Sequence, residues 1–101
     1  MQRCYNKKGE AIDLKTFAEL LEDREYVIIK QETLANGMWV STVWLGIDYG
    51  LVEPEPIIFE TMVFPRQGDY RDVDMQRYST EEAAIKGHKE MVLKWSGDIK
   101  G

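Results

Sequence analysis

Residues 39–47, W-V-S-T-V-W-L-G-I, decide the fold that we expect for this chain. The run is uncharged and rich in β-branched and aromatic residues, which is typical of a central strand in a small sheet. A second run of this kind, Ile57–Phe64, is its expected neighbour, and Tyr26–Leu34 is a third strand-like segment. Asn36-Gly37 lies between the third segment and the central one, and Asn-Gly in that place predicts a hairpin with a type I′ turn.

Two segments with helical spacing flank the strands. Asp13 is a suitable N-cap for a helix over Leu14–Asp23, where apolar residues recur at i, i+3, i+4 and i+7: Leu14, Phe17, Ala18 and Leu21. A second helix is expected over Thr80–Trp95, with Ser79 as N-cap and Glu82 completing a capping box. Its apolar stripe comprises Ala84, Ile85, His88, Met91, Val92 and Trp95. Gly87 disfavours this helix by about 1 kcal/mol relative to alanine, which indicates a close approach to the sheet.

The elements together predict one α+β domain over residues 1–101, a length that suits a single domain. We expect an antiparallel sheet of three long strands plus short edge strands, with the N-terminal and C-terminal helices packed mainly on one face. Met75–Tyr78 is the expected short fourth strand. Residues 1–12 are predicted to form an arm or a short hairpin turning at Gly9, and residues 96–101 a frayed tail.

Composition excludes several classes of function. The net charge is −5, from 13 basic and 18 acidic residues, which argues against direct binding of nucleic acid or an anionic membrane and permits a basic protein partner. The element order is similar to that of a double-stranded RNA-binding domain, but Glu81 and Glu82 stand where such a domain needs basic residues. The chain has no membrane-length apolar run and no signal-peptide pattern, and its one cysteine, Cys4, excludes an intrachain disulfide. We therefore expect a cytoplasmic protein.

Catalytic motifs are absent from the sequence. It has no phosphate-binding glycine loop, no C-x-x-C pair and no G-x-S-x-G, and with one histidine and one cysteine we expect neither a metal site nor a cofactor. The weak candidates for acid–base chemistry are Glu60, in the middle of a strand, and His88, with Tyr78 beside them. This hypothesis, a small-ligand binder or enzyme, requires a pocket between the sheet and the C-terminal helix. The alternatives are a solvent-facing glutamate and a histidine hydrogen-bonded at the core edge.

Protein binding is the main functional hypothesis. The loop Asp48–Pro56 is acidic, contains no basic residue and is longer than a tight turn requires, and such loops often carry function. With the acidic end of the first helix it forms the predicted contact surface, which comprises Asp48, Tyr49, Glu53, Glu55, Glu22 and Asp23. A homodimer is the alternative, because the central strand is apolar on both faces and a second subunit would cover one of them.

The sequence also resembles a family of small proteins encoded by bacteriophages and prophages. The blocks that carry the resemblance are V-S-T-V-W-L-G (Val40–Gly46), I-F-E-T-M-V-F (Ile58–Phe64) and R-Y-S-T-E-E-A (Arg77–Ala83), followed by Gly87-His88. The chain departs from the family at Leu51–Glu55, where relatives carry a glycine-rich segment. The resemblance implies an accessory role in the bacterial host cytoplasm, such as inhibition of a host defence or transcription enzyme, without implying a mechanism.

Overall fold

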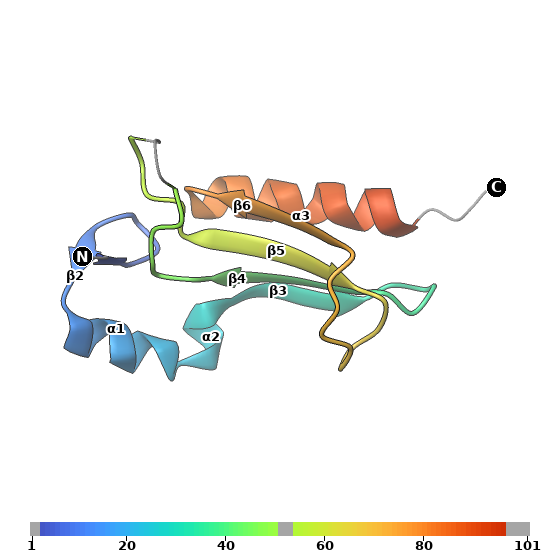
Figure 1. Cartoon of the computed structure of the whole chain (residues 1–101), viewed down its shortest axis with the longest axis horizontal. Helices are drawn as coiled ribbons and strands as arrows, with labels where there is room; N and C mark the ends of the chain where they lie inside the picture. The colour runs from blue at the N-terminus through green and yellow to red at the C-terminus, as the bar shows by residue number, and fades with distance from the viewer. Residues whose placement is uncertain (1–2, 51–53, 97–101) are drawn as a thin grey trace.

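The protein is described by a computed structural model that covers residues 3–50 and 54–96. Its centre is a four-stranded antiparallel sheet in the order β3-β4-β5-β6, built from β3 (Ile28–Thr33), β4 (Trp39–Trp44), β5 (Phe59–Phe64) and β6 (Asp74–Tyr78). The helix α3 (Glu81–Ser96) runs along the sheet and contacts all four strands (Figure 1). The predicted α+β class is therefore confirmed.

The N-terminal part forms a smaller layer at one end of this sheet. A two-stranded sheet of β1 (Cys4–Tyr5) and β2 (Ala11–Ile12) precedes two helices, α1 (Leu14–Leu21) and α2 (Arg24–Val27). The hairpin predicted around Gly9 is present, and Gly9 has the expected positive φ of 81°. The predicted tail beyond Ser96 lies outside the described residues.

The register of the sheet decides which side chains face α3. Val40, Thr42 and Trp44 of β4 lie opposite Val63, Thr61 and Phe59 of β5, and all six are buried. Phe17 of α1 packs edge-on against Trp44, with ring centroids 5.8 Å apart. The N-terminal helices thus extend the layer that α3 begins, at the Trp44 end of the sheet. At that end Gly46 adopts φ 79° and lies so close to Phe17 that a β-carbon would meet its ring at 2.5 Å.

The hairpin between β3 and β4 is present, but the predicted turn type is wrong. A type I′ turn needs positive φ at both central residues, and only Gly37, with φ 91°, has it. The turn instead closes with Gly37 N–H donating to Leu34 O at 2.9 Å and Leu34 N–H donating to Met38 O at 2.7 Å. Asn36 contributes through its side chain, which accepts from Met38 N–H and donates to Trp95 O.

The first helix ends two residues earlier than its pattern predicts, because Asp23 begins a new helix. The Asp23 carboxylate accepts from the backbone N–H groups of Glu25 and Tyr26 and caps α2, so the residues expected at the start of β3 are helical. The predicted apolar stripe of α1 is also wrong except at Phe17. Leu14, Ala18 and Leu21 are exposed.

The start of α3 also differs from the expectation. Thr80, not Ser79, caps the helix, since its hydroxyl oxygen accepts from Ala83 N–H at 3.1 Å. Ser79 donates instead to Glu55 at 3.2 Å. Ala84, His88 and Met91 of the predicted stripe are buried, whereas Ile85 is exposed; Gly87, which the stripe did not include, is buried as well.

Candidate functional site

One face of the sheet carries no helix in the described part of the chain. Side chains from β4, β5 and β6 point to it, on the side opposite α3, and they belong to types enriched at protein interfaces: aromatic residues, methionine and arginine. They are Trp39, Met62, Phe64, Met75 and Arg77, which we call the sheet-face patch. All five are at least partly exposed, so this surface is available for contact.

Cross-strand pairs hold the sheet-face patch in place. Trp39 lies opposite Phe64, with ring centroids 5.7 Å apart and planes 34° apart, and Met62 lies opposite Met75. Pairs of this kind contribute about 0.2–1 kcal/mol each relative to alanine pairs. The side chains are therefore partly ordered before any partner arrives, which lowers the entropy lost on binding.

Glu60 lies on this same face, away from His88. Its carboxylate accepts from Arg77 Nε at 3.0 Å, and the Arg77 guanidinium carbon lies 4.6 Å from the centre of the Tyr49 ring. The glutamate is buried beneath these groups, whereas Tyr49 is 47% exposed. The structure therefore makes Glu60 the ion-pair partner of a surface arginine and does not bring it together with His88.

The acidic loop after β4 is closed by one of its own carboxylates. Asp48 Oδ1 accepts from Gly50 N–H and from Ile57 N–H, both at 2.8 Å, so this predicted contact residue joins the two ends of the loop. Tyr49 remains exposed, and Glu55 accepts from Ser79. Glu53 lies outside the described residues.

The other half of the predicted contact surface is elsewhere. Glu22 ends α1 and Asp23 caps α2, and both side chains are exposed. Figure 1 shows the junction of α1 and α2 and the loop after β4 well separated, on opposite sides of the end of the sheet. The six predicted residues thus form two distinct acidic regions.

His88 lies at the centre of a buried polar chain. Its Nε2 lies 2.8 Å from Glu32 Oε1, and its Nδ1 lies 2.7 Å from Thr42 Oγ1, which in turn contacts Thr61 Oγ1 at 2.5 Å. The hydrogen bond from His88 and the charge of Lys30 hold the pKa of Glu32 below its ordinary value. Because an ionised carboxylate only accepts, Nε2 carries the proton of that bond.

The polar chain from Glu32 to Thr61 has the connectivity of a catalytic triad, but its imidazole and its hydroxyl are enclosed. His88 is 1% exposed and Thr42 is 0% exposed. Two hollows, of about 340 and 210 Å³, lie beside the histidine, and Lys30, His88 and Lys89 line both of them. Both ring nitrogens nevertheless face protein partners. The arrangement corresponds to the alternative in which the histidine is hydrogen-bonded at the core edge.

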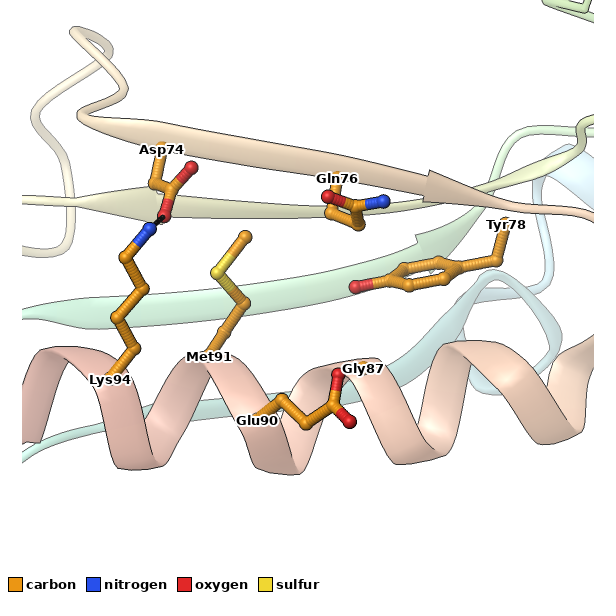
Figure 2. A pocket seen from close by; sticks show the side chains of 7 residues that line it. All are labelled: Asp74, Gln76, Tyr78, Gly87, Glu90, Met91 and Lys94. Atoms are coloured by element: carbon orange, nitrogen blue, oxygen red, sulfur yellow. Dashed lines mark hydrogen bonds and ion pairs between the residues drawn. The ribbon is translucent and has the colours of Figure 1, made fainter.

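Tyr78 lines a groove on the other side of α3. The groove, which we call the β6–α3 groove, has a volume of about 310 Å³ and is lined by Asp74, Gln76, Tyr78, Gly87, Glu90, Met91 and Lys94. Figure 2 shows the Tyr78 hydroxyl pointing into the space between Gln76, Glu90 and Met91. The tyrosine is 9% exposed, and its hydroxyl makes no hydrogen bond to any residue that the structure describes.

The electrostatics of the groove follow from its carboxylates. Burial raises the pKa of Tyr78, and the negative charges of Glu90 and Asp74 raise it further. An interaction with the Thr61 side chain lowers the pKa in part, although Thr61 Oγ1 contacts Thr42 Oγ1 at 2.5 Å and the Tyr78 hydroxyl meets no described residue with hydrogen-bond geometry. Lys94 and Trp95 both donate to Asp74 Oδ2 at 2.8 Å and hold the pKa of that carboxyl below its ordinary value.

Sequence reasoning missed the sheet-face patch. It hypothesised a pocket between the sheet and the C-terminal helix that used Tyr78 together with Glu60 and His88, whereas neither of these two residues lines the β6–α3 groove. The alternation of Asp74, Gln76 and Tyr78 along β6 was available as a signal, since residues two apart share a face. Gly87 also indicated a close approach. Neither observation identifies the groove without the pairing of β6 with β5.

Within residues 3–50 and 54–96, no cluster of three histidine, cysteine, aspartate or glutamate side chains could hold a metal ion. None of the described helices combines the length and the apolar character that crossing a membrane requires. No protein-family model, curated protein or solved structure matches the chain.

Proposed function

We propose that this protein is a non-enzymatic protein-binding module and that it contacts a partner protein through the sheet-face patch. The observation that carries the proposal is the gathering of Trp39, Phe64, two methionines and an arginine on a sheet face without a helix. Aromatic residues and arginine dominate the binding energy of protein interfaces. In this proposal the loop residue Tyr49, stacked on Arg77, extends the contact surface beyond the strand edges.

The charge of the chain favours a basic partner over a second copy. Two copies with a net charge of −5 each repel one another, whereas a cationic surface is attracted. Within the sheet-face patch the charge of Glu60 is compensated by Arg77, so an apolar surface on the partner would fit the patch. The net charge of −5 would favour basic groups around that surface. The resemblance to small phage proteins points to a host protein as the partner, with inhibition of a defence or transcription enzyme as the proposed outcome.

An enzyme or small-ligand function using Glu60 and His88 is less well supported. Glu60 points to the face of the sheet opposite α3, whereas the His88 side chain is buried between α3 and the sheet, where both of its ring nitrogens face protein partners. Self-association remains the second candidate, because the same apolar patch fits a second copy if charge repulsion is overcome.

The test compares two equally drastic substitutions of exposed apolar residues. Met75→Glu places a charge in the sheet-face patch, whereas Leu93→Glu places it on α3, where Leu93 is 77% exposed and outside the patch. A stoichiometric host protein recovered with the tagged wild type is purified, and its Kd for each variant is measured by calorimetry. We expect Met75→Glu to weaken binding at least about tenfold and Leu93→Glu to leave it unchanged.

Size measurements complete the experiment. If the wild type is a monomer at high concentration, self-association is excluded; if it is a dimer that Met75→Glu dissociates, the occupant of the patch is a second copy. Equal affinity of both variants for the partner would contradict the proposal. Circular dichroism and urea unfolding of each variant show that a loss of binding does not reflect a loss of folding.

A further inference from the structure

We propose that the β6–α3 groove is a binding site for a cationic group on a slim, unbranched stem, that is, an alkylammonium or a guanidinium. The site lies on the α3 side of the sheet and is independent of the sheet-face patch. The groove has three parts that fit such a ligand: an unpartnered hydroxyl, an uncompensated charge and an apolar floor.

The first part is the Tyr78 hydroxyl. Buried polar groups almost always have a hydrogen-bond partner, and one without a partner is costly to bury. The Tyr78 hydroxyl is buried, has no partner among the described residues and points into the groove (Figure 2). A ligand that donates a hydrogen bond to this oxygen would remove the penalty.

The second part is the charge of the groove. Asp74 is compensated by Lys94 at 2.8 Å, whereas Glu90 makes no ion pair or hydrogen bond with the residues that the structure describes. One uncompensated negative charge therefore remains in the groove that Tyr78 also lines. A bound cation would form a charge-assisted hydrogen bond with Glu90, which is stronger than a neutral one.

The third part is shape. The volume of about 310 Å³ is at the lower end of ligand pockets, so it suits a single side-chain-sized group. Met91 and the Tyr78 ring form an apolar floor between the polar groups, and Gly87 adds no side chain that would block it. A methylene stem would lie on this floor while its cationic end reaches Glu90, Gln76 and the Tyr78 hydroxyl (Figure 2).

The experiment is an NMR titration of the full chain with two probes. Agmatine presents a guanidinium on a four-carbon stem, and the tripeptide acetyl-Ala-Arg-Ala-amide presents the same group as a protein side chain. We expect saturable shifts at the Gly87 backbone amide and the Gln76 side-chain amide. Binding of agmatine alone assigns the groove to free amines, and binding of the peptide with similar affinity assigns it to a basic side chain.

Three variants separate the site from general charge attraction. Glu90→Gln should raise Kd about tenfold, because it removes the negative charge that attracts the cation, and Tyr78→Phe should raise it as well, because it removes the hydroxyl acceptor. Glu82→Gln removes the same charge from an exposed position on α3 outside the groove and should leave Kd unchanged. Linear, unsaturated shifts, or equal weakening by Glu90→Gln and Glu82→Gln, would overturn the proposal.

Discussion

Gly87 of α3 and Tyr78 of β6 pack so closely that a β-carbon at position 87 would overlap the tyrosine ring and hydroxyl. We predict that Gly87→Ala lowers the free energy of unfolding by about 1–3 kcal/mol, because overpacking of a core contact outweighs the gain of about 1 kcal/mol in helix propensity. Urea unfolding monitored by circular dichroism measures the change. In a Tyr78→Ala background, where the ring is absent, the same substitution should be neutral or stabilising. A loss of stability in both backgrounds would show that the contact with Tyr78 is not its cause.

The N-terminus of α3 offers a matched pair of substitutions. Thr80→Ala removes the hydroxyl that accepts from Ala83 N–H, so it should lower the free energy of unfolding by about 1 kcal/mol. Ser79→Ala removes only a hydrogen bond to the exposed Glu55, so its effect should stay within about 0.5 kcal/mol. Chemical unfolding of both variants distinguishes them. The reverse order would restore Ser79 as the N-cap that the sequence predicts.

Thr42 lies in the middle of the buried polar chain from Glu32 to Thr61, so its substitution should lower the stability of the fold. Thr42→Val keeps the shape of the side chain but leaves His88 Nδ1 and the Thr61 hydroxyl without their partner. We expect the free energy of unfolding to fall by about 1–3 kcal/mol, the cost of burying an unpaired polar group. Thr33→Val, the same change at an exposed position of β3, serves as control and should have little effect. An equal change in the free energy of unfolding for the two variants would mean that the buried hydrogen bonds of Thr42 do not stabilise the fold.

Glu32 should make stability depend on pH in the acid range. Its pKa in the folded protein is lowered from 4.5, chiefly by the hydrogen bond from His88, so its ionised form favours the folded state. That contribution is present above pH 4.5 and is lost as the pH falls through the lowered pKa. Glu32→Gln removes the ionisation, so the stability advantage of the wild type over this variant should shrink between pH 7 and pH 3. Urea midpoints of both proteins at the two pH values provide the test, and a constant difference would contradict it.

Much of the fold follows from local sequence rules. The strands contain β-branched and aromatic residues, and Asn36-Gly37 marks the hairpin, so the antiparallel sheet and its order were predictable along the chain. The predicted element boundaries are wrong where a polar side chain hydrogen-bonds to nearby backbone N–H groups and so starts a helix at a different residue. Asp23 begins a second helix within a strand-like run, and Thr80 takes the cap that the pattern assigns to Ser79. Both choices are made by local hydrogen bonds from the backbone to a polar side chain, which propensities do not contain.

The candidate sites were less predictable, since they depend on register. Alternation along β5 places Glu60 among apolar residues, and the helical spacing of α3 does the same for His88, but only the pairing of β5 with β4 shows that Glu60 points to the face of the sheet opposite α3. The sheet-face patch likewise combines residues from three strands, and the β6–α3 groove combines a strand with a helix. Side chains that are brought together only by pairing of distant strands do not form a local motif in the sequence, so the sequence does not reveal such a site.

The polar chain from Glu32 through His88 to Thr61 also limits the position of α3 along the sheet. Apolar burial, such as that of Ala84 and Met91, is non-directional and by itself does not fix the position of a helix along a sheet. A slide of one turn, about 5.4 Å, would carry the imidazole away from both of its partners and leave each of them desolvated. The same slide would bring another side chain of α3 to the point where Gly87 meets Tyr78, which has no room for a β-carbon, so these hydrogen bonds and this contact together fix the helix in one position.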